Sequence, residues 1–417
     1  MIAANVVDVA NDTPRPDPGV AVHISLFTGM VSAAIIYDAL PPILPALSAE
    51  FGGGERGDLI AQLAMTIPLL GMAVSGLIAG TAIEKFGVKK VLLAAIICFA
   101  VAGSSGAMIH TSAPLFVVRF LAGLASGTLI TCGTSLIAGN FMQSAQLHKT
   151  GRLYAVGAIC SIGFVVVAGF LATISWRLPF FLHAFIAILF LIPVILLPKN
   201  ADGVKFGFKD DQKTLGFFKR LLVLKPARRA FLLITLLNFL SYLFSVEFVF
   251  LLSSVGVTSP IIIANGVMVY AAAALAGNLL ITRVDARIGI MNTILAGLSL
   301  IAISFLICAT APNFWLLILG PLVGGLGTGL SIPSTIALIM RSIPTELAAR
   351  ALSFGTAMMY LGGGVAPILL APVRSALGLR GVYYFSATLI LVVMLPSLVP
   401  LFNRCWQTFR LRDSTPK

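Results

Sequence analysis

Long apolar runs alternate with short polar gaps along the whole chain. An apolar stretch of about 20 residues is long enough to cross the hydrocarbon core of a bilayer as a helix. Lipid forces such a segment to satisfy its backbone polar groups internally, which a helix does. The runs that meet this rule predict twelve transmembrane helices, at residues 21–47, 58–80, 90–110, 113–140, 152–174, 178–197, 230–253, 259–281, 289–310, 313–340, 350–373 and 380–402. The predicted fold class is therefore an all-α membrane protein.

The gaps between the apolar runs hold the positive charge of the chain, whose formal net charge is +13. Lys and Arg accumulate in cytoplasmic loops of membrane proteins. With both termini in the cytoplasm, Arg119 is the one basic residue in the interior of a span, and the basic residues on the outer side are Arg56, Arg177, Arg374 and Arg380. We expect a multi-pass protein of the plasma (inner) membrane with both termini cytoplasmic. This topology explains the charge without a nucleic-acid partner.

The widest polar gap, residues 198–229, contains nine Lys and Arg residues. We expect it to be a cytoplasmic linker that lies along anionic lipid headgroups. The predicted organisation is an N-terminal tail (1–20), a six-helix bundle (21–197), the basic linker (198–229), a second six-helix bundle (230–402) and a C-terminal tail (403–417).

Composition narrows the function classes. Hydrophobic residues make up 59% and charged residues 10% of the chain, against about 45–50% and about 25% in soluble domains. The cysteines lack CxxC spacing and the histidines lack paired spacing, so no metal site or other cofactor is predicted. His183, inside a span, is either a hydrogen-bonded interior histidine or a proton carrier, and the first is favoured. A membrane enzyme would need a concentrated set of acids or ligands, and only two acids lie in the interior of the spans.

An internal repeat is visible at an offset of about 198–204 residues. Arg152-Leu153-x-x-x-Gly157 opens the fifth span and Arg350-Ala351-x-x-x-Gly355 opens the eleventh. Ala113-Pro114-x-Phe116 is matched by Ala311-Pro312-x-Phe314, and Gly127-Thr128 by Gly327-Thr328. Such repeats mark the two halves of many secondary transporters.

The loop between the second and third spans reads Gly80-x-x-x-Glu84-Lys85-Phe86-Gly87-x-Lys89-Lys90. It resembles the hallmark loop of the major facilitator superfamily, with Glu and Lys where the family has Asp and Arg. The resemblance implies two pseudo-symmetric six-helix bundles and a cytoplasmic gate. Gly80 would allow close helix contact and Glu84 would face the start of the eleventh span, while Lys85, Lys89 and Lys90 would supply the cations of the latch.

Other motifs extend this resemblance over nearly the whole chain. Arg119-x-x-x-Gly123-x-x-x-Gly127 is similar to the fourth-helix motif of the superfamily. Asp285-Ala286-Arg287-Ile288-Gly289 resembles a degenerate second copy of the loop between the second and third spans. The first span, from Tyr37-Asp38 to Pro45, resembles the twelve-helix drug:proton antiporter branch. The resemblance implies a monomeric alternating-access transporter, with a small-molecule substrate and protons as the coupling ion, rather than an enzyme.

Asp38 and Glu247 are the two acids that lie in the interior of predicted spans. A carboxylate in hydrocarbon costs about 2.5–3.5 kcal/mol on insertion scales, so a cation or a proton must neutralise it. Asp38 lies about 13 Å and Arg119 about 9 Å from the same outer surface at 1.5 Å per residue. We predict that the two side chains interact and that protonation of Asp38 is the coupling event. The alternatives are a permanent ion pair and an Arg119 that extends to the outer headgroups.

Glu247 lies about six residues, or about 9 Å, from the outer end of the seventh span. It is either a second proton-coupling site or a residue at the rim that reaches water, and the pattern slightly favours the rim.

A set of polar residues in the spans predicts a substrate cavity between the two halves. Its candidate lining residues are Tyr37, Gln62, Thr131, Asn238, Tyr242, Asn265, Tyr270 and Tyr360, together with Ser241 and Asn278. For any single residue, a helix–helix hydrogen bond worth about 0.6 kcal/mol is the alternative.

The leading functional hypothesis is proton-coupled efflux of a small organic molecule by alternating access. The alternative is proton symport that takes up a small organic anion, with Arg119 receiving the carboxylate.

Overall fold

The chain was analysed as a computed structural model, which describes residues 19–141, 143–198, 225–343 and 348–413. Within these ranges the protein is helical and has no β-strand. Among the described residues, eleven segments are long and apolar enough to cross a membrane. The last of them, Phe354–Leu395, contains both final predicted spans and turns at Gly378, where φ is 71°. The eleven segments therefore account for all twelve predicted spans.

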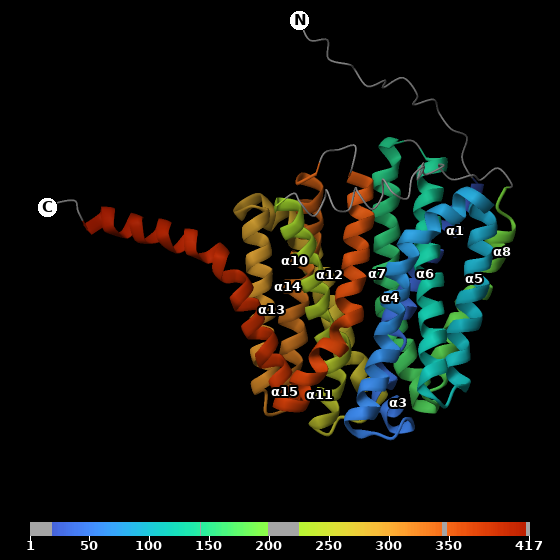
Figure 1. The fold of residues 1–417 in the computed structure, drawn as a ribbon, viewed down its shortest axis with the longest axis horizontal. Helices are drawn as coiled ribbons and strands as arrows, with labels where there is room; N and C mark the ends of the chain where they lie inside the picture. The colour runs from blue at the N-terminus through green and yellow to red at the C-terminus, as the bar shows by residue number, and fades with distance from the viewer. Residues whose placement is uncertain (1–18, 142, 199–224, 344–347, 414–417) are drawn as a thin grey trace, which may run out of the picture. The chain divides into compact units, whose positions relative to one another are not determined.

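Successive helices follow the predicted spans in order (Figure 1). Their bounds are α1 Gly19–Leu26, α2 Thr28–Asp38, η1 Pro41–Ile43, α3 Leu44–Glu50, α4 Gly54–Phe86, α5 Val88–Ser105, η2 Gly106–Met108, α6 Ser112–Asn140, α7 Gln143–Ile174, η3 Leu178–Phe181, α8 Leu182–Ile195, α10 Lys225–Tyr242, η4 Leu243–Glu247, α11 Phe248–Ser254, α12 Pro260–Ile288, α13 Ile290–Thr310, α14 Phe314–Arg341 and α15 Ala348–Asp413. The predicted N-terminal tail and basic linker fall mostly outside the described residues, and the predicted C-terminal tail is helical as far as Asp413.

The chain divides into two compact units, residues 1–268 with 339–367 and residues 269–338 with 368–417. In the first unit α4 packs along α6, α5 lies against α6 and α8, and α2 contacts α6 and α7. This unit holds every residue of the candidate site described below. The predicted bundle boundaries at the basic linker stay a prediction.

The first predicted span is not one continuous helix. Helix α2 ends at Asp38 and the chain continues through a 3-10 turn at Pro41–Ile43 before α3. Pro41 and Pro42 have no backbone N–H and cannot continue the helical hydrogen bonds, which explains the break. Asp38 therefore lies at a helix end inside the apolar segment.

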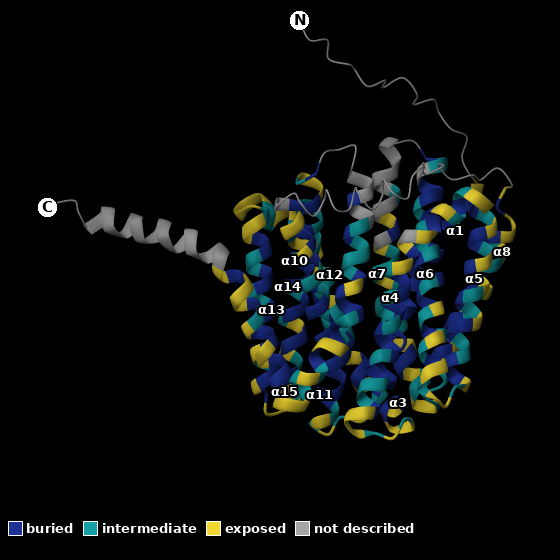
Figure 2. Cartoon of the chain, viewed as in Figure 1, coloured by how far each residue is buried: buried dark blue, intermediate teal, exposed yellow. Residues whose placement is uncertain are grey.

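Many large apolar side chains of the helices are exposed, and Figure 2 colours the exposed positions along the helices yellow. On α8, Phe185, Ile188 and Ile192 are each more than half exposed, and Trp315 at the start of α14 is 81% exposed. Apolar surface of this extent along whole helices is typical of a protein that faces lipid.

Matched backbone features support the predicted duplication. Gly87 lies between α4 and α5 with φ 83° and donates to the Ile83 carbonyl, while Gly289 lies between α12 and α13 with φ 81° and donates to the Asp285 carbonyl. A methyl group at Gly123 would lie 1.9 Å from the Pro68 carbonyl oxygen, and one at Gly325 would lie 2.4 Å from that of Tyr270. Each pair is related by 202 positions. The structure therefore matches Gly127 with Gly329 and not with Gly327.

Candidate functional site

Asp38, at the end of α2, is buried, and its carboxylate oxygen Oδ2 accepts a hydrogen bond from the Ser161 hydroxyl of α7. Among the described residues no ion pair reaches this carboxylate. The predicted interaction with Arg119 is therefore absent from this structure, although α2 packs against both α6 and α7. A buried carboxylate held by a neutral hydroxyl is a candidate for binding and releasing a proton.

Arg119 is fully buried, in the N-terminal third of α6. Its Nε donates to the backbone carbonyl of Ala64 in α4 at 2.8 Å, and its Nη1 lies 3.4 Å from Nε2 of His183 in α8. Within the described part of the chain its Nη2 has no hydrogen-bond partner. The alternative in which Arg119 extends to the outer headgroups is wrong for this structure, because the side chain has no exposed surface.

His183 accepts from Arg119 because its other ring nitrogen is already used. Its Nδ1 lies 2.9 Å from the carbonyl oxygen of Phe180, so this nitrogen carries the proton and Nε2 is the acceptor. The ring also packs closely on α5, since a methyl group at Gly103 would lie 2.3 Å from it. This agrees with the predicted interior, hydrogen-bonded histidine.

Glu247 is buried, with 1% of its surface exposed. It ends the π-helical turn Leu243–Glu247, which interrupts the seventh span between α10 and α11. Its Oε1 accepts hydrogen bonds from Nε2 of Gln62 at 3.1 Å and from the hydroxyl of Tyr242 at 3.3 Å. The favoured alternative of a rim residue that reaches water is wrong here. π-helical turns within α-helices occur frequently at functional sites.

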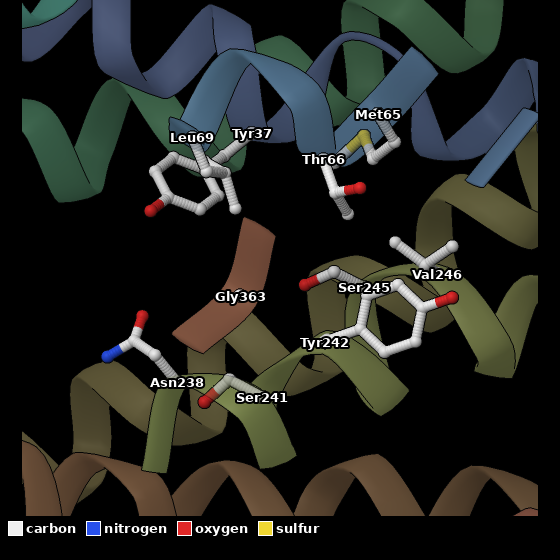
Figure 3. A pocket seen from close by; sticks show the side chains of 10 residues that line it. All are labelled: Tyr37, Met65, Thr66, Leu69, Asn238, Ser241, Tyr242, Ser245, Val246 and Gly363. Atoms are coloured by element: carbon white, nitrogen blue, oxygen red, sulfur yellow. The ribbon is translucent and has the colours of Figure 1, made fainter. Parts of the chain in front are cut away.

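A cavity of about 40 Å³ lies beside this carboxylate (Figure 3), and by volume it has room for about three water molecules. Met65, Thr66 and Leu69 of α4 and Tyr37 of α2 line one side. Asn238, Ser241, Tyr242, Ser245 and Val246 of the seventh span line the other, with Gly363 of α15 between them. The polar lining side chains are hydroxyls and one amide, and none of the lining residues is an acid, a histidine, a lysine or an arginine.

The predicted lining residues divide into three groups. Tyr37, Asn238 and Tyr242 line the cavity, as does Ser241. Two more lie next to it: Gln62 bonds Glu247, and the Tyr360 ring lies 6.5 Å from that of Tyr37. The others lie outside the lining of this cavity.

Thr131 donates to the carbonyl of Gly127 one turn earlier in its own helix. Asn265 is exposed on α12, and Tyr270 is not among the residues that line the cavity. Residues the sequence did not single out are Thr66 and Ser245. Thr66 lies one helical turn from the predicted residue Gln62, and Ser245 lies one turn from Ser241. Because residues four apart share a helix face, this spacing could have identified both from the sequence.

Of the predicted gate motif, the structure describes the loop and both flanking helices. Lys89 donates to the carbonyls of Ile195 and Leu197 at 2.7 and 2.6 Å, so it caps the C-terminal end of α8. Lys85 lies over the ring of Phe86 at 5.2 Å. Gly80 is buried, whereas Lys90 is exposed. The expected contact of Glu84 with the start of the eleventh span, at residue 350, stays a prediction.

The sequence was compared with known families and proteins. A sequence model described as "Major Facilitator Superfamily" matches residues 26–260 and 231–405. No curated protein matches the chain.

Solved structures share the fold over most of the chain. A D-xylose-proton symporter has a TM-score of 0.72 at 16% identity, covering 90% of this chain and 95% of its own. The nucleoside transporter NupG has a TM-score of 0.69 at 15% identity, covering 91% and 98%. The xylose transporter XylE from E. coli, in an inward-open conformation, has a TM-score of 0.62 at 15% identity, covering 90% and 94%.

Proposed function

Because the chain belongs to the major facilitator superfamily, a family of multi-pass membrane transporters and not of enzymes, we propose that it is a proton-coupled secondary transporter that exports a small organic molecule. The observation that carries this proposal is the position of Tyr242. Its side chain lines the cavity, and its hydroxyl donates to the buried carboxylate of Glu247. The hydrogen bond from Tyr242 to Glu247 therefore connects a change of charge on that carboxylate to a substrate bound in the cavity.

The protonation state of Glu247 sets the strength of the bonds around it. A carboxylate accepts hydrogen bonds about twice as strong as those of a neutral group. Protonation weakens the bonds from Gln62 and Tyr242, and so loosens the contact between α4 and the seventh span. Asp38 is the second proton site, because its carboxylate is buried and held by the hydroxyl of Ser161. Protons at these two sites would favour one conformation of the transport cycle over the other.

The lining of the cavity favours an uncharged polar substrate. Hydroxyl and amide groups of Tyr37, Thr66, Asn238, Ser241 and Ser245 can pair with hydroxyl, carbonyl or amide groups of a ligand. The space of about 40 Å³ in this conformation is smaller than a metabolite, so the site must widen when substrate enters. Alternating access provides that change.

Uptake by proton symport is the second candidate, and the D-xylose-proton symporter has the same fold. The version in which Arg119 receives an organic anion is disfavoured, because Arg119 does not line the cavity and bonds Ala64 and His183 instead. Export remains the leading direction because the first span resembles the drug:proton antiporter branch.

The remaining features of the proposal concern the membrane. The protein spans the inner membrane with both termini in the cytoplasm, because Lys and Arg concentrate on the cytoplasmic side. The basic linker lies along anionic lipid headgroups on the same side. The transporter is proposed to work as a monomer.

A flux experiment in proteoliposomes tests the proposal. Purified protein is reconstituted, and a panel of radiolabelled neutral, cationic and anionic metabolites is screened with the vesicle interior made acidic or alkaline. Proton-coupled export predicts that an acidic interior drives substrate into the vesicles, because protons leave as substrate enters. Symport predicts accumulation with an acidic exterior. Accumulation that ignores both gradients would contradict proton coupling.

A further inference from the structure

Helix α4 contains a proline, Pro68, in its interior. A proline has no backbone N–H, so the carbonyl four residues earlier loses its helical hydrogen-bond donor. In α4 that carbonyl belongs to Ala64, which is fully buried. A buried carbonyl without a donor destabilises the fold, and in a membrane no water is at hand to replace the missing bond.

Arg119 supplies the missing donor. Its Nε lies 2.8 Å from the carbonyl oxygen of Ala64. Because the guanidinium has several donors in one plane, the same side chain also reaches His183. Within the described residues no carboxylate pairs with the charge of Arg119. The role of this arginine is therefore the hydrogen bond to Ala64 and not an ion pair.

The packing of α6 on α4 holds the two groups in register. Arg119 is opposite Ala64, Gly123 is opposite Pro68, and Gly127 is opposite Met72, and each pair is separated by 55 positions. A methyl group at Gly123 would lie 1.9 Å from the Pro68 carbonyl oxygen. The glycine therefore permits the close approach that brings Arg119 to Ala64, one helical turn away.

The second half of the chain offers an internal comparison. At the offset of 202 positions, Pro68 corresponds to Tyr270 and Arg119 to Pro321. Tyr270 has a backbone N–H, so no carbonyl is left without a donor at that place in α12. The helix contact itself is kept, because Gly325 approaches the Tyr270 carbonyl as Gly123 approaches that of Pro68. The second half therefore keeps the close helix contact, but it has neither a proline at the position of Pro68 nor an arginine at the position of Arg119.

We propose that Arg119 is a positioning residue that replaces the helical hydrogen bond removed by Pro68, and so fixes the segment of α4 that carries Gln62, Met65 and Thr66. Met65 and Thr66 line the cavity and Gln62 bonds Glu247. The effect on substrate binding rests on the function proposed above, whereas the replacement of the hydrogen bond does not.

A double-substitution cycle tests this proposal on the full-length protein. Arg119→Met removes the donor, and Pro68→Ala returns an N–H to Ala64. We expect Arg119→Met alone to lower the melting temperature of the purified protein in detergent and to raise the KM of transport about tenfold. In the Pro68→Ala background the loss of melting temperature should be at most about half as large, and KM should return to within about threefold of wild type.

Pro193 in α8 provides the matched control. It is also a proline within a helix, and the carbonyl four residues earlier belongs to Leu189, which is 54% exposed and does not contact Arg119. Pro193→Ala should not rescue Arg119→Met. Equal losses in the wild-type and Pro68→Ala backgrounds, or failure of Arg119→Met to fold in both, would overturn the proposal. If no background transports any substrate, the melting temperatures alone decide it, separately from the proposed function.

Discussion

Gln62 donates a hydrogen bond from Nε2 to Oε1 of Glu247 at 3.1 Å, and these residues are 185 positions apart in the chain. Gln62 lies in α4 and Glu247 ends the π-helical turn of the seventh span, so the bond joins the first and second halves of the sequence. The same oxygen accepts from Tyr242, which lines the cavity. A buried carboxylate, a contact between two helices and the lining of the cavity are therefore linked by two hydrogen bonds.

Asp38→Asn is predicted to abolish proton-driven accumulation while leaving a folded protein. Asparagine has nearly the same shape as aspartate but does not bind or release a proton at this position. Uphill transport is measured in proteoliposomes with an imposed pH gradient, and folding by the melting temperature in detergent. Asp58→Asn is the control, because Asp58 is partly exposed near the start of α4 and bonds Ser48. Normal uphill transport by Asp38→Asn would remove Asp38 from the mechanism.

Asn238→Leu is predicted to weaken substrate binding by about two- to twelvefold, because a lost hydrogen bond to a bound polar ligand is worth about 0.5–1.5 kcal/mol. Binding is measured by isothermal titration calorimetry with the substrate found in the flux screen. Asn265→Leu makes the same chemical change at an exposed position of α12 that does not line the cavity. It should leave the Kd within about twofold of wild type. Equal effects of the two substitutions would argue against this cavity as the substrate site.

Gly123→Ala is predicted to destabilise the protein by about 1–3 kcal/mol, since overpacking a close contact forces the backbones apart. The added methyl group would lie 1.9 Å from the Pro68 carbonyl oxygen, and backbone atoms cannot move aside cheaply. Gly163→Ala in α7 is the control, because nothing lies within 4 Å of a methyl group there. Thermal unfolding in detergent should separate the two variants, and equal melting temperatures would show that the α4–α6 contact is looser than described.

Much of the fold followed from the sequence because lipid imposes a simple rule on length and polarity. The spans, their order and the repeat were all readable from apolar runs, charges and spaced glycines. The break after Asp38 was not predicted, although Pro41 and Pro42 gave the signal, because the run remains apolar through the 3-10 turn. The C-terminal spans were predicted separately, and the structure joins them across Gly378.

The partners of the buried charged residues were harder to predict. Depth along a helix places a residue in the membrane but does not say which face of the helix carries it. Arg119 and Asp38 were matched by depth, yet Arg119 bonds a carbonyl in α4 and Asp38 bonds Ser161 in α7. Glu247 was favoured as a rim residue for the same reason, and it is buried. Pro68 in the second span was the available sign that α4 carries a carbonyl in need of a donor.

The most direct measurement compares two modes of transport in the Glu247→Gln variant. Exchange of labelled for unlabelled substrate across the vesicle membrane needs no net proton movement, whereas accumulation against a gradient does. Glutamine keeps a polar group that can accept from Gln62 and Tyr242 but carries no titrating proton, so exchange should persist while pH-driven accumulation is lost. Glu55→Gln, at an exposed glutamate at the start of α4, should retain both. Undiminished pH-driven accumulation by Glu247→Gln would contradict a coupling role for this carboxylate.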